Sequence, residues 1–119
     1  MLPLKVSPII TDALQNNKPI IVIESTIFAH GLPSPINFDC ALKIEKTILE
    51  SGVVPAISIL NNGYINIGYD KELIKKITNS KNVEKVSTRD IASTLYNKKI
   101  GATTVAGTIV CAKAAGIDI

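Results

Sequence analysis

Residues 19–26 read PIIVIEST, and this stretch decides the fold. Four aliphatic side chains in a row, at positions 20–23, are typical of a strand buried on both faces in a parallel sheet. Residues 53–60, VVPAISIL, repeat the pattern. Helical segments lie between such strands, so the sequence predicts an α/β fold with a mixed, mainly parallel sheet flanked by helices. Such sheets usually have more strands, so we expect residues 1–119 to be the N-terminal part of a single domain, truncated within it.

Turn and cap residues divide the rest of the chain into short elements. We expect Ser34 to be the N-cap of a helix with Pro35 at its first position, and Gly52 to end that helix. Asn61-Asn62-Gly63 predicts a hairpin turn before YINIGY, and Asp70 is placed to cap the helix KELIKKITN. The other predicted elements are helices over 7–17, 88–97 and 103–116, a strand over 83–87, and a strand that begins at 117–119.

The composition argues against several classes of protein. The chain has 119 residues, 46% of them apolar and 19% charged, which fits one folded domain. A net charge of +3 gives no reason to expect a nucleic-acid partner. Cys40 and Cys111 form neither a disulfide framework nor a zinc motif, so we interpret them as packing residues in a reducing compartment. The sequence shows no signal-peptide pattern and no apolar run of about 18 residues, so we expect a cytoplasmic protein with no membrane partner.

Polar residues follow three of the predicted strands, at the edge where open α/β sheets bind ligands. They are Glu24, Ser25 and Thr26, then Asn61 and Asn62, then Ser87, Thr88, Arg89 and Asp90. Glu24 comes directly after four aliphatic residues, where desolvation would favour its protonated form, as a general acid requires. Two structural alternatives remain: Glu24 pairs with Arg89, or it caps a loop amide.

Basic residues and a helix start suggest a second kind of site. Lys85 and Arg89 lie four residues apart at a strand end, where they could bind phosphate or sugar oxygens, or could simply be solvated. The start of GATTVA, residues 101–106, could hold an anion with its free amides and helix dipole. His30 is the single histidine, which argues against a multi-histidine metal site. The sequence has no phosphate loop of the nucleotide triphosphatases, no dinucleotide-binding glycine motif and no serine-hydrolase elbow.

Four blocks of the sequence together resemble one enzyme family. They are IVIESTIFAHGLPSPIN at 21–37, VPAISILNNGYINIG at 54–68, KVSTRD at 85–90 and GATTVAGTI at 101–109. In this order and at this spacing, they resemble the pseudouridine-5′-phosphate glycosidases, a family that includes proteins labelled indigoidine-synthase-A-like. The combination of ESTIxAHGxPxP with GATTVA is long and unusual. The resemblance covers nearly all of the chain from Pro19.

This resemblance implies a reaction, a cofactor and site residues. Family members reversibly cleave the carbon–carbon glycosidic bond of pseudouridine 5′-phosphate to uracil and ribose 5-phosphate, use a divalent metal, typically manganese, and are generally homotrimers. The family's catalytic glutamate, a proton donor, matches Glu24, and its substrate contacts fall on Lys85 and Val105, with Thr104 beside the latter. A carbon leaving group departs only when it is protonated, which is the chemistry that Glu24 would supply.

The chain also departs from the family pattern. Members are much longer, and we expect their Gly-rich block ending in His, their metal-binding aspartate and their imine-forming lysine beyond Ile119. Lys85 does not take the place of that lysine, and Thr88 stands where the family commonly has Arg. Two alternatives to the glycosidase therefore stay open: a catalytically inactive fragment of that enzyme, and a phosphosugar-binding module.

Overall fold

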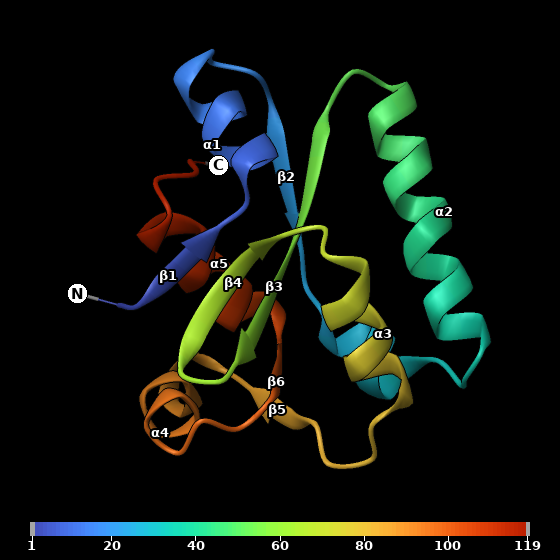
Figure 1. The fold of residues 1–119 in the computed structure, drawn as a ribbon, viewed down its shortest axis with the longest axis vertical. Coiled ribbons are helices and arrows are strands. Elements are labelled where there is room, and N and C mark those ends of the chain that lie inside the picture. Colours follow the sequence, from blue (N-terminus) through green and yellow to red (C-terminus); the bar gives the residue numbers. More distant parts are fainter. Residues whose placement is uncertain (1, 119) are drawn as a thin grey trace.

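The computed structural model describes residues 2–118 as a sheet with helices on both faces (Figure 1). The strands are β1 (Leu4–Val6), β2 (Ile20–Ile23), β3 (Val54–Asn61), β4 (Tyr64–Gly68), β5 (Glu84–Val86) and β6 (Gly101–Thr103). The helices are α1 (Pro8–Gln15), α2 (Ile36–Glu50), α3 (Lys71–Asn79), α4 (Ile91–Tyr96) and α5 (Val105–Ala114), with a π-helix η1 (Ile27–Gly31) and a 3-10 helix η2 (Thr88–Asp90). The predicted α/β fold class is confirmed.

The sheet is mixed, as the sequence predicted. Its strands lie in the order β1-β4-β3-β6-β5, and β2 also pairs with β3. The pairs β1–β4, β2–β3 and β5–β6 are parallel, whereas β3–β4 and β3–β6 are antiparallel. Parallel neighbours need a crossover connection. Helix α2 lies in the crossover from β2 to β3, and α4 lies in the crossover from β5 to β6.

Strand β3 is the centre of the sheet, and one of its edges is shared by two strands. β4 lies along one edge of β3. Along the other edge, β2 pairs with residues 54–57 and β6 pairs with residues 59 and 60. Because β2 runs parallel and β6 antiparallel to β3, the carboxyl ends of β2 and β6 point toward each other. They leave a break in the pairing beside Ser58, and we call this place the strand junction.

Alternate residues of β3 fill two apolar cores, one on each face of the sheet. Ala56 and Leu60 belong to the core that also holds residues of α1, α4 and α5. Ile57 and Ile59 belong to the core that holds residues of η1, α2 and α3. Burial on both faces explains why this strand is apolar at nearly every position.

The predicted hairpin and helix cap are confirmed. Asn62 and Gly63 have φ of 52° and 83°, as a two-residue turn between antiparallel strands requires. The Asp70 Oδ1 atom accepts hydrogen bonds from the N–H groups of Glu72 (2.9 Å) and Leu73 (3.3 Å) at the start of α3. Local sequence therefore determines these two features.

The sequence predictions for β6 and β2 are wrong in part. Residues 101–103 form β6, whereas the sequence predicted a helix from residue 103, because small side chains at a short buried strand resemble the helix that follows. A Cβ atom on Gly101 would lie 2.5 Å from Val86 Cγ2, so close packing excludes larger residues from this strand. Strand β2 is not buried on both faces, since Ile21 is 47% exposed. Its pairing with β3 covers one edge, and we find no second strand partner within residues 2–118.

Further differences concern the chain ends. The three-residue strand β1 was not predicted, because three residues are too few for a pattern. Residues 117 and 118 belong to no strand, and the rest of the strand predicted at 117–119 lies outside the described residues. Helix α1 buries Ile10 and Ala13 but leaves Ile9 68% exposed.

Helix α2 begins one residue later than predicted. Pro35 is its N-cap rather than its first residue, and the Ser34 Oγ atom donates to Asn79 Oδ1 (3.4 Å) instead of capping the helix. The predicted end is confirmed, because Gly52 follows the helix with a φ of 83°. The stretch between β2 and α2, predicted as a loop, contains the π-helix η1.

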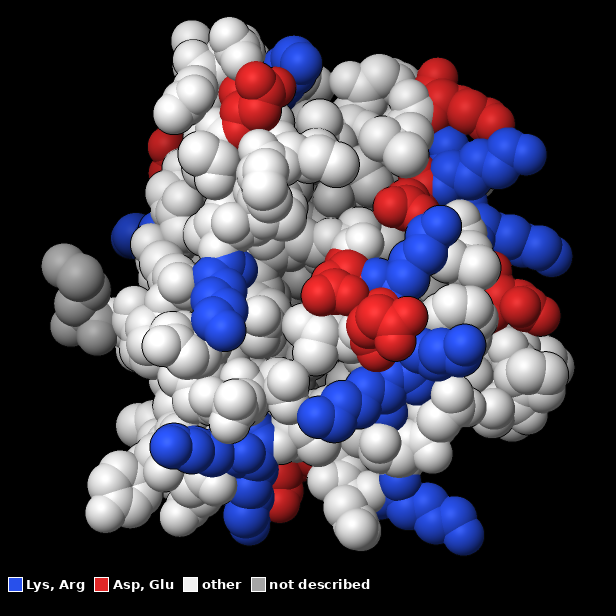
Figure 2. All heavy atoms as spheres, in the orientation of Figure 1, with Lys and Arg blue, Asp and Glu red and all other residues white. Residues whose placement is uncertain are grey.

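Charges of both signs alternate over the face that carries α2 and α3 (Figure 2). No block of a single sign covers this face of the molecule. None of the helices within residues 2–118 has both the length and the apolar character needed to cross a membrane.

Candidate functional site

Two backbone hydrogen bonds bring together segments that are far apart in the sequence. The N–H of Ser25 donates to the carbonyl oxygen of Thr103 (3.0 Å), which joins the tip of β2 to the end of β6. The N–H of Thr104 donates to the carbonyl oxygen of Val86 (3.0 Å), which joins the start of α5 to the end of β5. The strand junction is therefore a meeting point of three strand ends and one helix N-terminus.

All four predicted site residues lie beside these contacts. Glu24 precedes Ser25, Lys85 precedes Val86, and Thr104 and Val105 form the start of α5. The sequence predicted that the polar residues after β2 and after β5 lie at the same edge of the sheet, and the backbone contacts bring these two strand ends together. Among residues 2–118, no hydrogen bond or ion pair joins the Glu24 and Lys85 side chains directly.

Glu24 is half-buried at the tip of β2. Its Oε2 atom accepts a hydrogen bond from the N–H of Ile27 (3.3 Å), so the carboxylate caps the first turn of η1. The predicted alternative of a loop cap is therefore confirmed. The alternative of a pair with Arg89 is wrong, because the Arg89 side chain is 91% exposed and its Nε lies 4.0 Å from Asp90 Oδ1.

The first turn of α5 is held in place by its own cap and by close packing. Thr104 is the N-cap, and its Oγ1 accepts a hydrogen bond from the N–H of Gly107 (3.2 Å). A Cβ atom on Gly107 would lie 2.6 Å from the carbonyl oxygen of Val86, so glycine lets the helix approach β5. Val105, the first helical residue, is 64% exposed. The positive end of the helix dipole thus lies at the strand junction, with an accessible residue at its start.

Lys85 lies in the middle of β5, opposite Ala102 of β6. Its side chain is exposed, whereas the next residue, Val86, is fully buried. Because side chains alternate along a strand, Lys85 and Val86 lie on opposite faces of the sheet. Val86 therefore anchors the strand in the core while Lys85 stays accessible.

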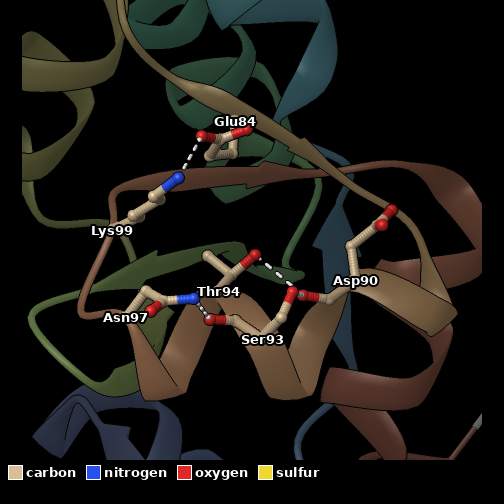
Figure 3. Close-up of polar contacts among 6 residues, drawn as sticks. All are labelled: Glu84, Asp90, Ser93, Thr94, Asn97 and Lys99. Atoms are coloured by element: carbon tan, nitrogen blue, oxygen red, sulfur yellow. Dashed lines mark hydrogen bonds and ion pairs between the residues drawn. The ribbon is translucent and has the colours of Figure 1, made fainter.

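A polar hollow of about 110 Å³ borders the outer side of β5 (Figure 3). The predicted site residue Lys85 is among its lining residues, and several of the other polar groups already bind one another. The Lys99 Nζ atom pairs with Glu84 Oε1 (3.3 Å), and the Thr94 Oγ1 atom donates to the carbonyl oxygen of Asp90 (2.7 Å). Small-molecule sites usually have a volume of about 300 Å³ or more. We therefore interpret the Lys99–Glu84 pair as a link between β5 and the segment before β6, and the Thr94 bond as a contact within η2 and α4.

Four buried hydroxyl groups lie at the strand junction, and sequence analysis had missed two of them. They belong to Ser25, Ser58, Thr103 and Thr108, and we call them the hydroxyl cluster. The sequence indicates Ser25 as a polar residue after a strand, and Thr103 lies in the segment GATTVA. Ser58 was a visible signal, as the one polar side chain within the apolar run 53–60, but nothing local indicated its partners. Thr108 lies in α5, among other small residues, and nothing in the sequence around it indicates that its hydroxyl group has a buried partner.

The second polar cluster of the sequence does not reach the strand junction. Asn61 lies at the hairpin end of β3, where its Oδ1 accepts a hydrogen bond from Lys76 Nζ (3.3 Å). β3 runs past the junction by three residues, so its own carboxyl end lies elsewhere. The expectation that Asn61 and Asn62 share an edge with Glu24 is therefore wrong.

Another cavity, of about 290 Å³, lies beside β1, β4 and α3 and contains none of the predicted site residues. Two of its polar side chains already have hydrogen-bond partners. Asn66 Nδ2 donates to the Ile59 carbonyl oxygen (3.2 Å), and Asp70 caps α3. No group of three or more His, Cys, Asp or Glu side chains that could hold a metal is found within residues 2–118. The described residues therefore do not fit a manganese site by themselves.

Burial raises the pKa of two side chains in the described part of the chain. Burial raises the pKa of the Cys111 thiol to about 11. Burial, followed by the negative charge of Glu45, raises the pKa of the Tyr69 hydroxyl, which donates to the Ala41 carbonyl oxygen (2.5 Å). A thiol that stays protonated in an apolar core is unreactive, which agrees with the prediction that Cys111 is a packing residue.

The fold and this site define an α/β protein whose candidate ligand site is a break in the sheet, where strand tips meet a helix N-terminus. The chain belongs to the family "Indigoidine synthase A like protein", whose model matches residues 9–119. This finding confirms the resemblance drawn from the four sequence blocks.

Two relatives and one solved structure illustrate the similarity. The pseudouridine-5′-phosphate glycosidase of Staphylococcus aureus (strain MW2) is 44% identical over 109 residues, covering 92% of this chain and 36% of the relative. The enzyme of that name from Escherichia coli (strain K12) is 43% identical over 117 residues, covering 98% of this chain and 38% of the relative. The prealnumycin C-glycosynthase AlnA, solved in complex with ribulose 5-phosphate, superimposes with a TM-score of 0.87 at 36% identity and covers 98% of this chain and 37% of AlnA. The chain thus spans a little over a third of the length of these relatives.

Proposed function

We propose that the protein acts in the reversible cleavage of the carbon–carbon glycosidic bond of pseudouridine 5′-phosphate to uracil and ribose 5-phosphate. One observation carries the proposal: the Ser25–Thr103 hydrogen bond places the tip of β2, with Glu24, against the start of α5, with Thr104 and Val105. The names of the relatives support the reaction class, and the phosphosugar bound to AlnA supports the substrate class.

Glu24 is the proton donor of the proposed reaction. When the bond breaks, its electron pair stays on the uracil carbon, and this carbon must take up a proton. The carboxyl group of Glu24 supplies that proton. Over the whole reaction, water provides the hydroxyl that the sugar carbon gains, and its remaining proton restores the carboxyl group. In the reverse direction, the carboxylate takes the proton back from the uracil carbon. The half-buried place of Glu24 at the tip of β2 supports this role, and the bond from the N–H of Ile27 fixes the position of its carboxyl group.

The sugar and its phosphate contact Lys85, Thr104 and Val105. Lys85 is exposed and positively charged, so it can form charge-assisted hydrogen bonds to phosphate or sugar oxygens. The N–H groups of Val105 and Ala106, at the positive end of α5, have no partner among residues 2–118. Such free amides favour negatively charged oxygens.

The test uses the complete gene product that carries this chain, mixed with manganese, uracil and ribose 5-phosphate. We expect pseudouridine 5′-phosphate to form, and Glu24→Gln to lower its rate of formation by roughly 100-fold or more, because general acid catalysis contributes about that much. Glu50→Gln is the matched control, since Glu50 is an exposed glutamate at the end of α2.

Other results of this experiment would favour one of the alternative functions. Unchanged turnover in Glu24→Gln would remove Glu24 from the reaction. Binding of ribose 5-phosphate in a calorimeter without turnover would favour the phosphosugar-binding module. If the protein shows no binding and no turnover, the inactive fragment is favoured. Manganese as cofactor, a homotrimer and a cytoplasmic location stay predictions of the family resemblance.

A further inference from the structure

The hydroxyl cluster fills a place where the sheet lacks a backbone partner. β6 pairs with β3 through Leu60–Gly101 and Ile59–Ala102, and one more step in this register would put Thr103 opposite Ser58. The Ser25 hydroxyl lies between them instead. It accepts a hydrogen bond from the N–H of Thr103 (2.7 Å) and donates one to the carbonyl oxygen of Ser58 (2.7 Å). Ser25 therefore bridges the break in the sheet from the tip of β2.

Each hydroxyl hydrogen of the cluster has an acceptor in one consistent arrangement. Ser25 and Thr103 both donate to the carbonyl oxygen of Ser58, at 2.7 Å and 3.2 Å. The Ser58 and Thr108 hydroxyl oxygens lie 2.5 Å and 2.7 Å from Thr103 Oγ1, and they are the donors when the Thr103 hydrogen points to the Ser58 carbonyl oxygen. Ser58 Oγ also lies 3.3 Å from Thr108 Oγ1. Thr103 Oγ1 is thus the centre of the cluster, with two hydrogen bonds accepted and one donated. A fully satisfied buried network holds its members in one geometry.

The cluster joins the elements that carry the proposed site residues. Ser25 is next to Glu24, and Thr103 is next to Thr104. Thr108 lies one helical turn after Thr104, and its N–H donates to the Thr104 carbonyl oxygen (2.8 Å). A bond from Thr108 to Thr103 therefore ties the first turn of α5 to the end of β6, and Ser25 ties both to the tip of β2.

We infer that Ser58 and Thr108 are positioning residues of the proposed site, which hold Glu24 in place relative to the first turn of α5. This inference rests on the proposed function. The side chains of Ser58 and Thr108 are buried, so they act through Ser25 and Thr103 rather than by touching the substrate. Apolar side chains of the same size would fill the space but would not fix the direction of either neighbour.

The test compares two substitutions at one position in the complete gene product. Thr108→Val keeps the shape and removes the hydroxyl, whereas Thr108→Ser keeps the hydroxyl. We expect Thr108→Val to lower kcat by roughly 10- to 100-fold, with a smaller change in KM, because a small misplacement of a catalytic group has this effect. Thr108→Ser is expected to restore most of kcat.

Thr78→Val is the matched control. Thr78 and Thr108 are both helical threonines that are 6% exposed, and the Thr78 Oγ1 donates to the Lys75 carbonyl oxygen (3.0 Å) in α3. We expect Thr78→Val to lower the melting temperature as Thr108→Val does, with kcat unchanged. Equal kcat in Thr108→Val and the unmodified protein, or an equal loss in both valine variants, would overturn the inference. If Thr108→Val does not fold, Thr108→Ala replaces it, since it removes the hydroxyl without adding bulk.

Hydrogen exchange separates this inference from the proposed function. In Thr108→Val the amides of Ser25 and Thr103 are expected to exchange roughly 10-fold faster than in Thr78→Val, because the cluster that holds them has opened. Absence of turnover in the unmodified protein would overturn the proposed function. The exchange rates alone would then show whether the hydroxyl cluster holds β2, β6 and α5 together. Unchanged exchange rates of the Ser25 and Thr103 amides in Thr108→Val would overturn the inference that Thr108 is a positioning residue.

Discussion

Ser25 and Thr103, which are 78 residues apart, exchange two hydrogen bonds from their backbone N–H groups: Ser25 N–H to the Thr103 carbonyl oxygen (3.0 Å), and Thr103 N–H to Ser25 Oγ (2.7 Å). The second bond replaces the strand partner that the end of β6 lacks. A single side chain therefore completes the backbone pairing of the sheet at the point where the site residues converge.

The change Ser25→Ala is expected to destabilise the fold by about 2 kcal/mol, because the buried N–H of Thr103 loses its acceptor. Urea denaturation measures the loss. Ser51→Ala is the control: Ser51 is exposed, its Oγ donates to the Ile48 carbonyl oxygen (2.7 Å), and its loss should cost less than about 0.5 kcal/mol. Equal costs for the two variants would show that the bridge contributes nothing beyond an ordinary surface hydrogen bond.

Local sequence predicts the elements of this fold better than their junction. The hairpin at Asn62-Gly63 and the cap at Asp70 depend on neighbours within three residues, so the pattern was sufficient. Strand β6 was missed because Gly101–Thr103 is short and made of small side chains, and what makes it a strand is its pairing with β3 and β5. Its conformation is set by tertiary contacts that no local pattern records.

The candidate site shows the same division. Glu24 was predicted from its place after an apolar run, and its partner Ile27 is three residues away. Ser58 contacts Thr103 across 45 residues, and Thr108 contacts Thr103 over 5 residues. Both contacts depend on the place of Thr103, which is set where β6 pairs with β3 and its end meets the end of β2. Predicting that meeting would require the register of both strands on β3, which the sequence alone does not specify.

The change Gly107→Ala is expected to lower stability by about 1–3 kcal/mol, although alanine is the better helix former. The new Cβ would lie 2.6 Å from the Val86 carbonyl oxygen, and a backbone atom cannot turn aside. Gly31→Ala is the control, since its Cβ would meet the Ile27 side chain at 3.3 Å, which can give way. Thermal unfolding compares the two. A Gly107→Ala variant as stable as the unmodified protein would mean that α5 can move away from β5 at little cost.

The change Asp70→Ala is expected to cost about 1 kcal/mol, because the N–H groups of Glu72 and Leu73 lose their shared acceptor at the start of α3. Asp70→Ser keeps a capping oxygen and should recover most of the loss. Urea denaturation of the three proteins measures both values. Serine and alanine variants of equal stability would show that the cap does not stabilise this helix.

Alkaline pH is expected to destabilise the fold through Cys111. Burial raises the pKa of this thiol from 9.0 to about 11, so above pH 9 the unfolded chain releases a proton that the folded chain keeps. The stabilisation is fully present below pH 9 and is lost as the pH rises through 11, by an amount on the order of 2 kcal/mol. Tyr69 acts in the same direction, because its pKa is also raised by burial.

Urea denaturation between pH 7 and pH 11 measures the free energy of unfolding. Its decline with pH should be shallower for Cys111→Ala. Val110→Ala, a truncation in the same helix with no titrating group, should keep the full decline. The same decline in Cys111→Ala and the unmodified protein would contradict the role of this thiol.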